Sequence, residues 1–540
     1  MADVNHPLDD GLPTSGPAHA ASAWAELEDQ VDIGTPSLRE LFAGDPARGE
    51  RMGIECADLW IDLSRQNLTY EILGFLHALA GQRRIGDTLM RTLLGDTVNG
   101  SEKRPAVHGA MRARDRLAPG PDVEAGFATF DRMETLATAL RAGEETGATG
   151  STITALVHLG IGGSHLGPAL AVDALAPFTH PDIEIRFSSS VDADDLAGAL
   201  GGLDPASTLV IACSKSFTTI ETLTALDGAL AWLAGGLGDA AIDHVLAVTA
   251  APERAKALGV DANRIYEIPV AVGGRFSLGS AVGLPVMVAI GPEAFDEMLT
   301  GMQVVDNLSA TKSPHENAAV QLALIDVWNR CHLGRSSMAV VPYAHRLRLF
   351  APWLQQLSME SLGKGTCENE SDPETPTGPT VWGATGTEAQ HAFFQLLHQG
   401  TDVIPVDLIG VARPTVDDVR SRKGTEVLIT NLAAQADALA FGRTADEVRA
   451  DGVDEELVAH RTFPGNRPST AILLSEITPS TLGQLIALYE NRTVAMAAVL
   501  GINPFDQWGV ELGKKMALDL ADGSAPESAL LRRARELRDD

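Results

Sequence analysis

Residues 208–222 read TLVIAC-SKSFTTIET, an apolar run with β-branched members that leads directly into a turn rich in hydroxyl side chains. Such a run is typical of a strand buried on both faces of a parallel sheet. Thr218, followed three positions later by Glu221, fits a capping box, which predicts a helix beginning there. A strand, a hydroxyl-rich turn and a helix start together form an anion site, suited to phosphate. On these residues alone, a capped Ser/Thr-rich turn without a ligand remains an equal alternative.

The charge of the chain limits what such a phosphate can belong to. Its 540 residues include 41 Lys plus Arg against 72 Asp plus Glu, a formal net charge of −31. This field repels polyanions, so we expect no nucleic-acid partner, and a small phosphorylated metabolite fits best. The first ten residues lack Lys and Arg, no apolar signal segment follows, and no apolar run approaches membrane-spanning length. We therefore expect a cytoplasmic protein that does not bind membranes.

The cysteines indicate neither a metal site nor a disulfide framework. Cys56, Cys213, Cys331 and Cys367 are scattered, without a CxxC pair or a Cys/His ligand spacing. We expect reduced thiols, with Cys213 packed inside its strand.

Apolar runs alternate with helical stretches through most of the chain, the pattern of a parallel α/β sheet. The first series of expected strands is 153–159, 183–187, 209–213 and 245–248, and the second is 337–341, 403–408 and 427–430. We therefore predict an α/β fold with two such units in tandem. The expected divisions are a loose tail at 1–22, a helical N-terminal region at 23–145, α/β domains at 146–300 and 301–515, and a helical C-terminal tail at 516–540.

A glycine-rich turn, GIGGSH at 160–165, follows the first expected strand. It does not complete the dinucleotide fingerprint GxGxxG, because His165 stands where the third glycine belongs, and no Walker A lysine follows any glycine. Neither NAD nor ATP is indicated. The glycines would let a ligand approach the backbone, with Ser164 offering a hydroxyl, although a tight turn without a ligand explains them as well.

Two helical segments carry candidate polar groups at helical spacing. Gln356 and Glu360 are four apart and would share one helix face, with Gly363 ending that helix. Near the C-terminus, Gln507, Glu511 and Lys514 would form one polar stripe. Such stripes are ordinarily solvated faces.

A histidine and an arginine complete the candidates. Thr387 and Gln390 fit a capping box, which would place His391 in the first turn of a helix, a position suited to acid/base chemistry. His398 lies seven residues on, and a structural role is favoured over a metal ligand. Arg275 follows two glycines, where its guanidinium could reach a developing negative charge.

In their order and wording, these segments resemble the phosphoglucose isomerase family, whose members interconvert glucose 6-phosphate and fructose 6-phosphate. Six blocks carry the resemblance: GIGGS at 160–164, SKSFTT at 214–219, GGRFSL at 273–278, QQLSMES at 355–361, QHAFFQLLHQG at 390–400 and DQWGVELGK at 506–514. VHGAMR at 107–112 and GNRPS at 465–469 match more loosely. The resemblance implies two tandem sugar-isomerase (SIS-type) α/β/α sandwich domains with parallel sheets, plus helical N-terminal and C-terminal segments.

The resemblance also implies roles. Glu360 matches the base that shuttles a proton between C1 and C2 through a cis-enediol, and Arg275 matches the arginine that stabilises the enediolate. His391 matches the ring-opening residue, supplied in the family by the partner subunit of a homodimer, and Lys514 matches the lysine that assists it. The matched substrate contacts are Gly163, Ser164, Ser214, Lys215, Ser216, Thr218, Thr219, Gln356 and Gln507. No metal or redox cofactor is needed for this chemistry.

Some positions depart from the usual wording of the family. They are Ser216 for threonine, Ile220 for glutamine, Leu362 for asparagine, Glu388-Ala389 for Asn-Gly, His165 for aspartate and Gly279 for tryptophan. They suggest a divergent bacterial branch, similar to the isomerase part of transaldolase–isomerase fusions. Two alternatives remain: an isomerase of broader hexose-phosphate specificity, and a sugar-phosphate-binding regulator. A regulator would lack the acid/base residues, so the presence of Glu360 and His391 favours catalysis.

Overall fold

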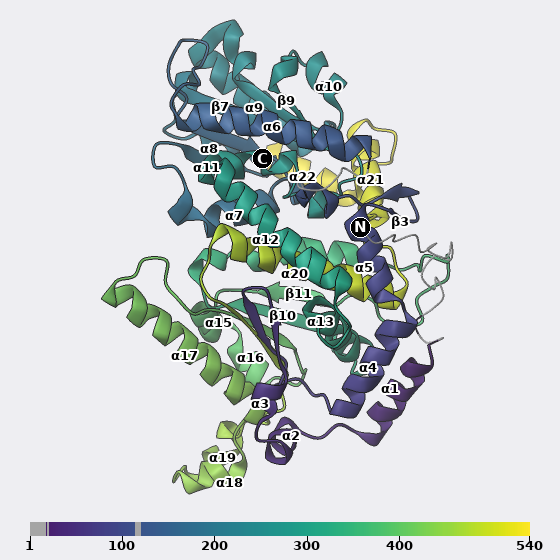
Figure 1. Ribbon diagram of the computed structural model, residues 1–540. Coiled ribbons are helices and arrows are strands. Elements are labelled where there is room, and N and C mark those ends of the chain that lie inside the picture. Colours follow the sequence, from purple (N-terminus) through teal and green to yellow (C-terminus); the bar gives the residue numbers. More distant parts are fainter. Residues whose placement is uncertain (1–17, 19–20, 114–119, 540) are drawn as a thin grey trace, which may run out of the picture. The chain divides into compact units, whose positions relative to one another are not determined.

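The strand expected at 208–213 lies in the middle of a five-stranded parallel sheet in the computed structural model (Figure 1). The strands are β5 (Ala155–Leu159), β6 (Glu184–Ser188), β7 (Thr208–Cys213), β8 (Val245–Thr249) and β9 (Ile265–Glu267), in the order β6-β5-β7-β8-β9. Every neighbouring pair is parallel. The first series of expected strands is confirmed, whereas β9 is too short to stand out in the sequence.

Both faces of this sheet are buried, as the apolar runs predicted. Val157, Val210 and Val245 pack in one core with α8 (Ala193–Leu200) and α9 (Ile220–Leu237). Alternate residues such as Leu156 and Ile211 are equally inaccessible from the opposite face. The chain moves in opposite directions from β5 to β6 and from β7 to β8. A topological switch point therefore lies between β5 and β7, where open sheets of this kind bind ligands.

The second sheet is mixed, in the order β1-β2-β13-β12-β10-β11. Its strands are β1 (Gly53–Cys56), β2 (Leu59–Asp62), β10 (Ser337–Pro342), β11 (Thr380–Gly383), β12 (Val406–Val411) and β13 (Ser469–Leu474). The last four are parallel, and the β1–β2 hairpin joins antiparallel at one edge. The N-terminal region is therefore not only helical, and it also forms a small hairpin of β3 (Thr97–Asn99) and β4 (Arg104–Pro105).

One expected strand of the second series is wrong. Residues 427–430 lie inside the helix α17 (Val419–Phe441). Leu432, Ala436 and Leu439 bury one face of α17 in a core shared with β10 and β12. That burial at helical spacing outweighs the strand preference of a short run with β-branched residues.

The helices that surround the two sheets have the following bounds. In the N-terminal region they are α1 (Ser22–Ile33), α2 (Leu38–Gly44), α3 (Arg48–Arg51), α4 (Tyr70–Gln82), α5 (Ile85–Leu94) and α6 (Pro121–Arg141). The next are α7 (Leu166–Ala174), α10 (Pro252–Ala257), α11 (Leu284–Ile290), α12 (Pro292–Thr311), α13 (Ala318–Val327) and α14 (Phe350–Gln355). The remaining ones up to residue 504 are α15 (Gly386–Ala392), α16 (Phe394–Gln399), α18 (Ala445–Ala450), α19 (Glu455–Arg461) and α20 (Pro479–Leu500).

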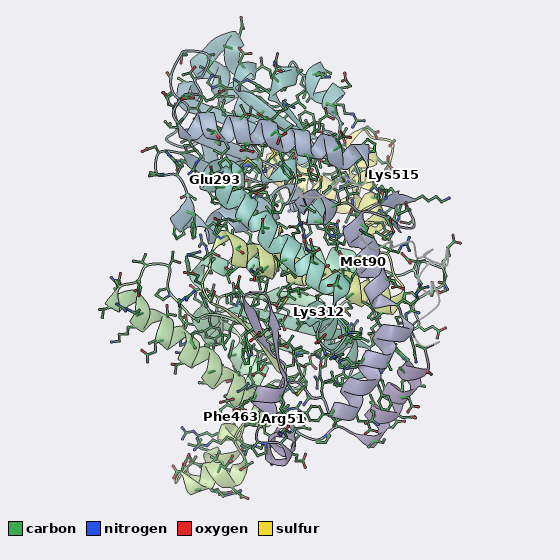
Figure 2. The ribbon with its side chains drawn as sticks, in the orientation of Figure 1. Arg51, Met90, Glu293, Lys312, Phe463 and Lys515 are labelled. Atoms are coloured by element: carbon green, nitrogen blue, oxygen red, sulfur yellow. The ribbon has the colours of Figure 1, made fainter. Side chains whose placement is uncertain are left out.

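Helices α12 and α20 run side by side between the two sheets (Figure 1). Two glycines permit their close approach. A Cβ at Gly301 would lie 2.1 Å from the Ser480 carbonyl oxygen, and a Cβ at Gly483 would lie 2.1 Å from that of Met298. Figure 2 shows Glu293 at the beginning of α12 and Lys312 just beyond its end, charges that suit the helix dipole.

The structure describes residues 18, 21–113 and 120–539, so most of the expected tail at 1–22 lies outside it. Contacts divide the chain into two units, Met1–Pro504 and Phe505–Asp540. The second unit contains α21 (Glu511–Ala521) and α22 (Ala529–Asp539). The domain boundaries expected at 146, 301 and 516 stay predictions. In the described part, no helix is long and apolar enough to cross a bilayer.

Candidate active site

Two loops flank the switch point of the five-stranded sheet. The glycine-rich turn at 160–164 follows β5, and the hydroxyl-rich turn at 214–219 follows β7. Leu159 pairs with Ala212, so the two loops leave the same edge of the sheet next to each other. Burial raises the pKa of the Cys213 thiol, at the end of β7, to about 12. All four cysteines are unpaired, as expected.

Hydroxyl groups of the second turn bind each other. Ser214 Oγ donates to Thr219 Oγ1 at 2.9 Å, and the hydroxyls of Ser216 and Thr218 lie 2.8 Å apart. The expected capping box between Thr218 and Glu221 is wrong, because α9 begins only at Ile220 with Thr219 as its N-cap. No side-chain hydrogen bond caps α9 at this described end. The start of α9 therefore offers its N–H groups and these hydroxyls to an anion.

Phe217 holds this turn in an unusual conformation. Its φ of +49° lies in the left-handed region, which costs a non-glycine residue roughly 1–2 kcal/mol. Its side chain is buried among the core residues beneath α9, and its N–H donates to Ser214 Oγ at 3.1 Å. Burial of the ring thus offsets the backbone strain that shapes the turn.

Lys215 ties the turn to the neighbouring loop. Its Nζ donates to the Val272 carbonyl at 2.8 Å, immediately before the Gly273-Gly274-Arg275 segment. Burial lowers the pKa of Lys215 to about 8. The lysine is therefore a half-buried cation that links the hydroxyl-rich turn to the arginine loop.

Glycines bring three of the sequence motifs into direct contact. A Cβ at Gly163 would lie 2.2 Å from the backbone of Gly274, and a Cβ at Gly162 would lie 3.0 Å from Gln356 Nε2. Ser277 Oγ donates to the Gly163 carbonyl at 3.3 Å. The glycine-rich turn, the arginine loop and the Gln356 helix therefore meet at one place.

Arg275 and Glu360 face each other at this meeting point. Arg275 Nη1 lies 3.6 Å from Glu360 Oε1, and their side chains are 1% and 20% exposed. Arg275 Nε donates to Ser361 Oγ at 2.6 Å, and Nη2 donates to the Pro504 carbonyl. A fixed, buried cation thus lies beside a carboxylate that solvent can reach. This pairing suits a reaction in which a base removes a proton and leaves an oxyanion nearby.

The segment Gln356–Glu360 is a π-helical turn that continues α14, not the regular helix expected. Its wider hydrogen bonding, from residue i to i+5, still keeps Gln356 and Glu360 on one side of the helix. Short π-turns of this kind occur frequently at functional sites.

The structure corrects the expected placement of His391. Its helix, α15, begins at Gly386 and ends at Ala392, because Phe393 leaves the helical conformation with a φ of −138°. His391 therefore lies in the last turn of a short helix, not the first, and its side chain is exposed. His398 lies on the next helix and shares a 2.8 Å hydrogen bond with Gln435, a contact that agrees with the favoured structural role.

The expected polar stripe near the C-terminus is also corrected. Gln507 precedes α21, which begins at Glu511, so only Glu511 and Lys514 share that helix. Gln507 and Lys514 belong to the second unit, and their roles stay predictions.

Two residues of the site were not singled out from the sequence. Ser361 directly follows Glu360, but the contact that distinguishes it is with Arg275, distant in the chain. Phe217 is distinguished by its positive φ. An aromatic residue within a hydroxyl-rich turn was the only signal for it, and propensity gives no reason to expect a left-handed phenylalanine.

Comparison with known proteins finds relatives over nearly the whole chain. The family model described as phosphoglucose isomerase matches residues 62–530. The chain is 47% identical to glucose-6-phosphate isomerase 1 of Streptomyces avermitilis and 45% identical to glucose-6-phosphate isomerase of Frankia casuarinae, with 92% of each chain covered in both cases. It also resembles the crystal structure of a glucose-6-phosphate isomerase from Chlamydia trachomatis, with a TM-score of 0.85, 30% identity and coverage of 97% and 99% of the two chains.

Proposed function

The chain belongs to the phosphoglucose isomerase family, and from that membership we propose how its residues interconvert D-glucose 6-phosphate and D-fructose 6-phosphate. The enzyme is an aldose–ketose isomerase of glycolysis and gluconeogenesis. The regulatory alternative is set aside, since the relatives are isomerases over nearly their whole length.

The proposal depends above all on Glu360 beside Arg275. Glu360 removes the proton from C2 of the open-chain aldose and returns it to C1. The cis-enediolate formed in between carries negative charge on oxygen, and the Arg275 guanidinium, 3.6 Å from the carboxylate, supplies a fixed positive charge. This pair supports proton transfer without requiring a metal ion.

The hydroxyl-rich turn anchors the other end of the substrate. Its hydroxyls, the start of α9 and the half-buried Lys215 bind the 6-phosphate. Anchoring the phosphate fixes C1 and C2 relative to Glu360, which lowers the entropic part of the barrier. The assigned contacts are Gly163, Ser164, Ser214, Lys215, Ser216, Thr218 and Thr219, with Gln356 and Gln507 lining the sugar.

Ring opening precedes the proton transfer, because only the open chain has the carbonyl that acidifies C2. We assign this step to His391, assisted by Lys514. His391 is exposed in the single chain, and among the described residues it forms no hydrogen bond or ion pair with Glu360. These observations support a homodimer in which each site receives His391 from the partner subunit. A cytoplasmic location is part of the same proposal.

The departures at Ser216, Ile220, Leu362 and Glu388 support two finer proposals. The chain stands in a divergent branch similar to the isomerase part of transaldolase–isomerase fusions. Ser216 lies in the phosphate-binding turn and Ile220 directly follows it, so the phosphate contacts differ there from the family pattern.

A coupled assay tests the function directly. Purified protein receives fructose 6-phosphate, and glucose 6-phosphate is detected by its dehydrogenase through NADPH formation. We expect rapid formation of glucose 6-phosphate and a much slower reaction with mannose 6-phosphate. Comparable rates with fructose 6-phosphate and mannose 6-phosphate would indicate an isomerase of broader specificity. The absence of a reaction with any hexose 6-phosphate would contradict the proposal.

A further inference from the structure

Two neighbouring residues of one helix contact the same guanidinium. Glu360 Oε1 lies 3.6 Å from Arg275 Nη1, and Ser361 Oγ accepts a hydrogen bond from Arg275 Nε at 2.6 Å. Consecutive residues of a helix point about 100° apart, so the guanidinium lies between the two directions. Unlike Glu360, Ser361 is fully buried, with 0% of its surface exposed, so its hydroxyl does not reach the substrate.

The bond from Ser361 determines which way the guanidinium faces. The donors of arginine form a rigid planar fork, so fixing two of them fixes the third. Ser361 binds Nε and the Pro504 carbonyl binds Nη2, which leaves the Nη1 side directed at Glu360. The long arginine side chain has several rotatable bonds, and these partners remove its freedom before the substrate arrives.

We infer that Ser361 is a positioning residue for the isomerase reaction, holding Arg275 in the orientation that stabilises the enediolate. The inference rests on the proposed function of Arg275 and Glu360. It predicts a particular kinetic signature. The substrate binds through its phosphate and hydroxyl groups, whereas the oxyanion develops only during proton transfer. Loss of the Ser361 hydroxyl should therefore lower kcat and leave KM nearly unchanged.

The competing explanation is that Ser361 only packs in the interior. Ser358 offers a matched control, because it is a buried serine of the π-helical turn that directly precedes Ser361, 5% exposed and without a hydrogen bond to Arg275. Ser358→Ala and Ser361→Ala each remove one buried hydroxyl from the same helix. A packing role would make the two variants alike in kcat once both are folded.

The experiment compares Ser361→Ala, Ser361→Cys and Ser358→Ala with the wild-type enzyme in the coupled assay, after thermal melting has shown which variants fold. We expect kcat of Ser361→Ala to fall about ten- to a hundredfold, the loss typical of a hydrogen bond to a charged group, with KM within about twofold. Ser358→Ala should keep the wild-type kcat. Ser361→Cys is close to isosteric and a weak acceptor, so it repeats the test if the alanine variant does not fold.

A double-mutant cycle separates positioning from packing. Arg275→Lys lacks the Nε donor, so adding Ser361→Ala to it should change kcat by less than about twofold. If Ser361→Ala lowered kcat equally in the wild-type and the Arg275→Lys enzymes, or left the wild-type kcat unchanged, the inference would be overturned while the proposed function stayed intact. A wild-type enzyme without isomerase activity would overturn the proposed function, and the inference with it.

Discussion

The Ser214 hydroxyl donates a 2.9 Å hydrogen bond to Thr219 Oγ1, so the first and last residues of the hydroxyl-rich turn are joined directly. The bond closes the turn that connects β7 to α9 and sets both oxygens at the start of that helix. The Thr219 hydroxyl accepts this bond and keeps its own proton to donate, so a phosphate there would meet a hydroxyl already held in place by Ser214, which reduces the entropy lost on binding.

Removing both hydroxyls should weaken substrate binding. We expect Ser214→Ala combined with Thr219→Ala to raise KM for fructose 6-phosphate by about tenfold or more, because the loss of one hydrogen bond to a charged phosphate costs about 1.5–3 kcal/mol. Steady-state kinetics measures the change. Thr224→Ala, at an exposed position of α9, is the control and should leave KM unchanged. An unchanged KM in the double variant would mean that the phosphate binds elsewhere.

The activity should depend on the charge of Lys215. Burial lowers the pKa of Lys215 to about 8, so the side chain is a cation below that pH and becomes neutral as the pH rises through it. We expect kcat/KM to fall on the alkaline side with a midpoint near 8, since this ratio reports the free enzyme. Lys215→Met should have a lower kcat/KM at pH 7 and lack this alkaline decline.

The surface residue Lys256, paired with Glu253, supplies the control for that profile. Lys256→Met should reproduce the wild-type pH dependence. A Lys215→Met enzyme that keeps the same alkaline decline would assign the titration to another group.

Phe217 should contribute to stability as well as to the shape of the turn. Replacing a buried phenylalanine by alanine costs about 3–5 kcal/mol, so Phe217→Ala should unfold at a clearly lower denaturant concentration. Phe217→Leu keeps most of the buried volume and should lose much less. We also expect KM for the phosphorylated substrate to rise in Phe217→Ala. If Phe217→Ala unfolded at the same denaturant concentration as the wild type and kept the wild-type KM, the ring would not hold the turn.

A site shared between subunits makes a quantitative prediction for mixed dimers. Glu360→Gln and His391→Ala should each be inactive alone. In a 1:1 mixture that is unfolded and refolded together, half of the dimers combine both variants, and each of these has one intact site. The mixture should therefore regain about one quarter of the wild-type activity. No recovery, with refolded wild-type enzyme active, would place Glu360 and His391 of one site on the same chain.

Much of the fold followed from local patterns. The alternation of apolar runs with helical stretches identified β5 to β8, because strands buried on both faces are apolar throughout. The run at 427–430 was mistaken for a strand, because the apolar residues of α17 are of the same types as those of a buried strand. The β1–β2 hairpin was missed because it joins the sheet only through the pairing of β2 with β13, a distant tertiary contact.

The site was predictable as a set of motifs, while its geometry was not. The order of the motifs led to Glu360 and Arg275. The Thr218 and Thr387 capping boxes were wrong because α9 begins later, at Ile220, and α15 begins earlier, at Gly386. The Ser361 contact depends on how a π-turn meets a loop from the other sheet, and no local pattern encodes that meeting.

The central claim is that the Glu360 carboxylate carries the proton between C1 and C2. The most direct test follows fructose 6-phosphate in deuterated water by NMR, with wild-type enzyme, Glu360→Gln and, as a control for loss of a surface charge, Glu370→Gln. We expect wild type and the control to form glucose 6-phosphate and to incorporate deuterium from solvent. Glu360→Gln should do neither, while it still binds fructose 6-phosphate with near wild-type affinity. Deuterium incorporation or isomerisation by Glu360→Gln at the wild-type rate would contradict the account.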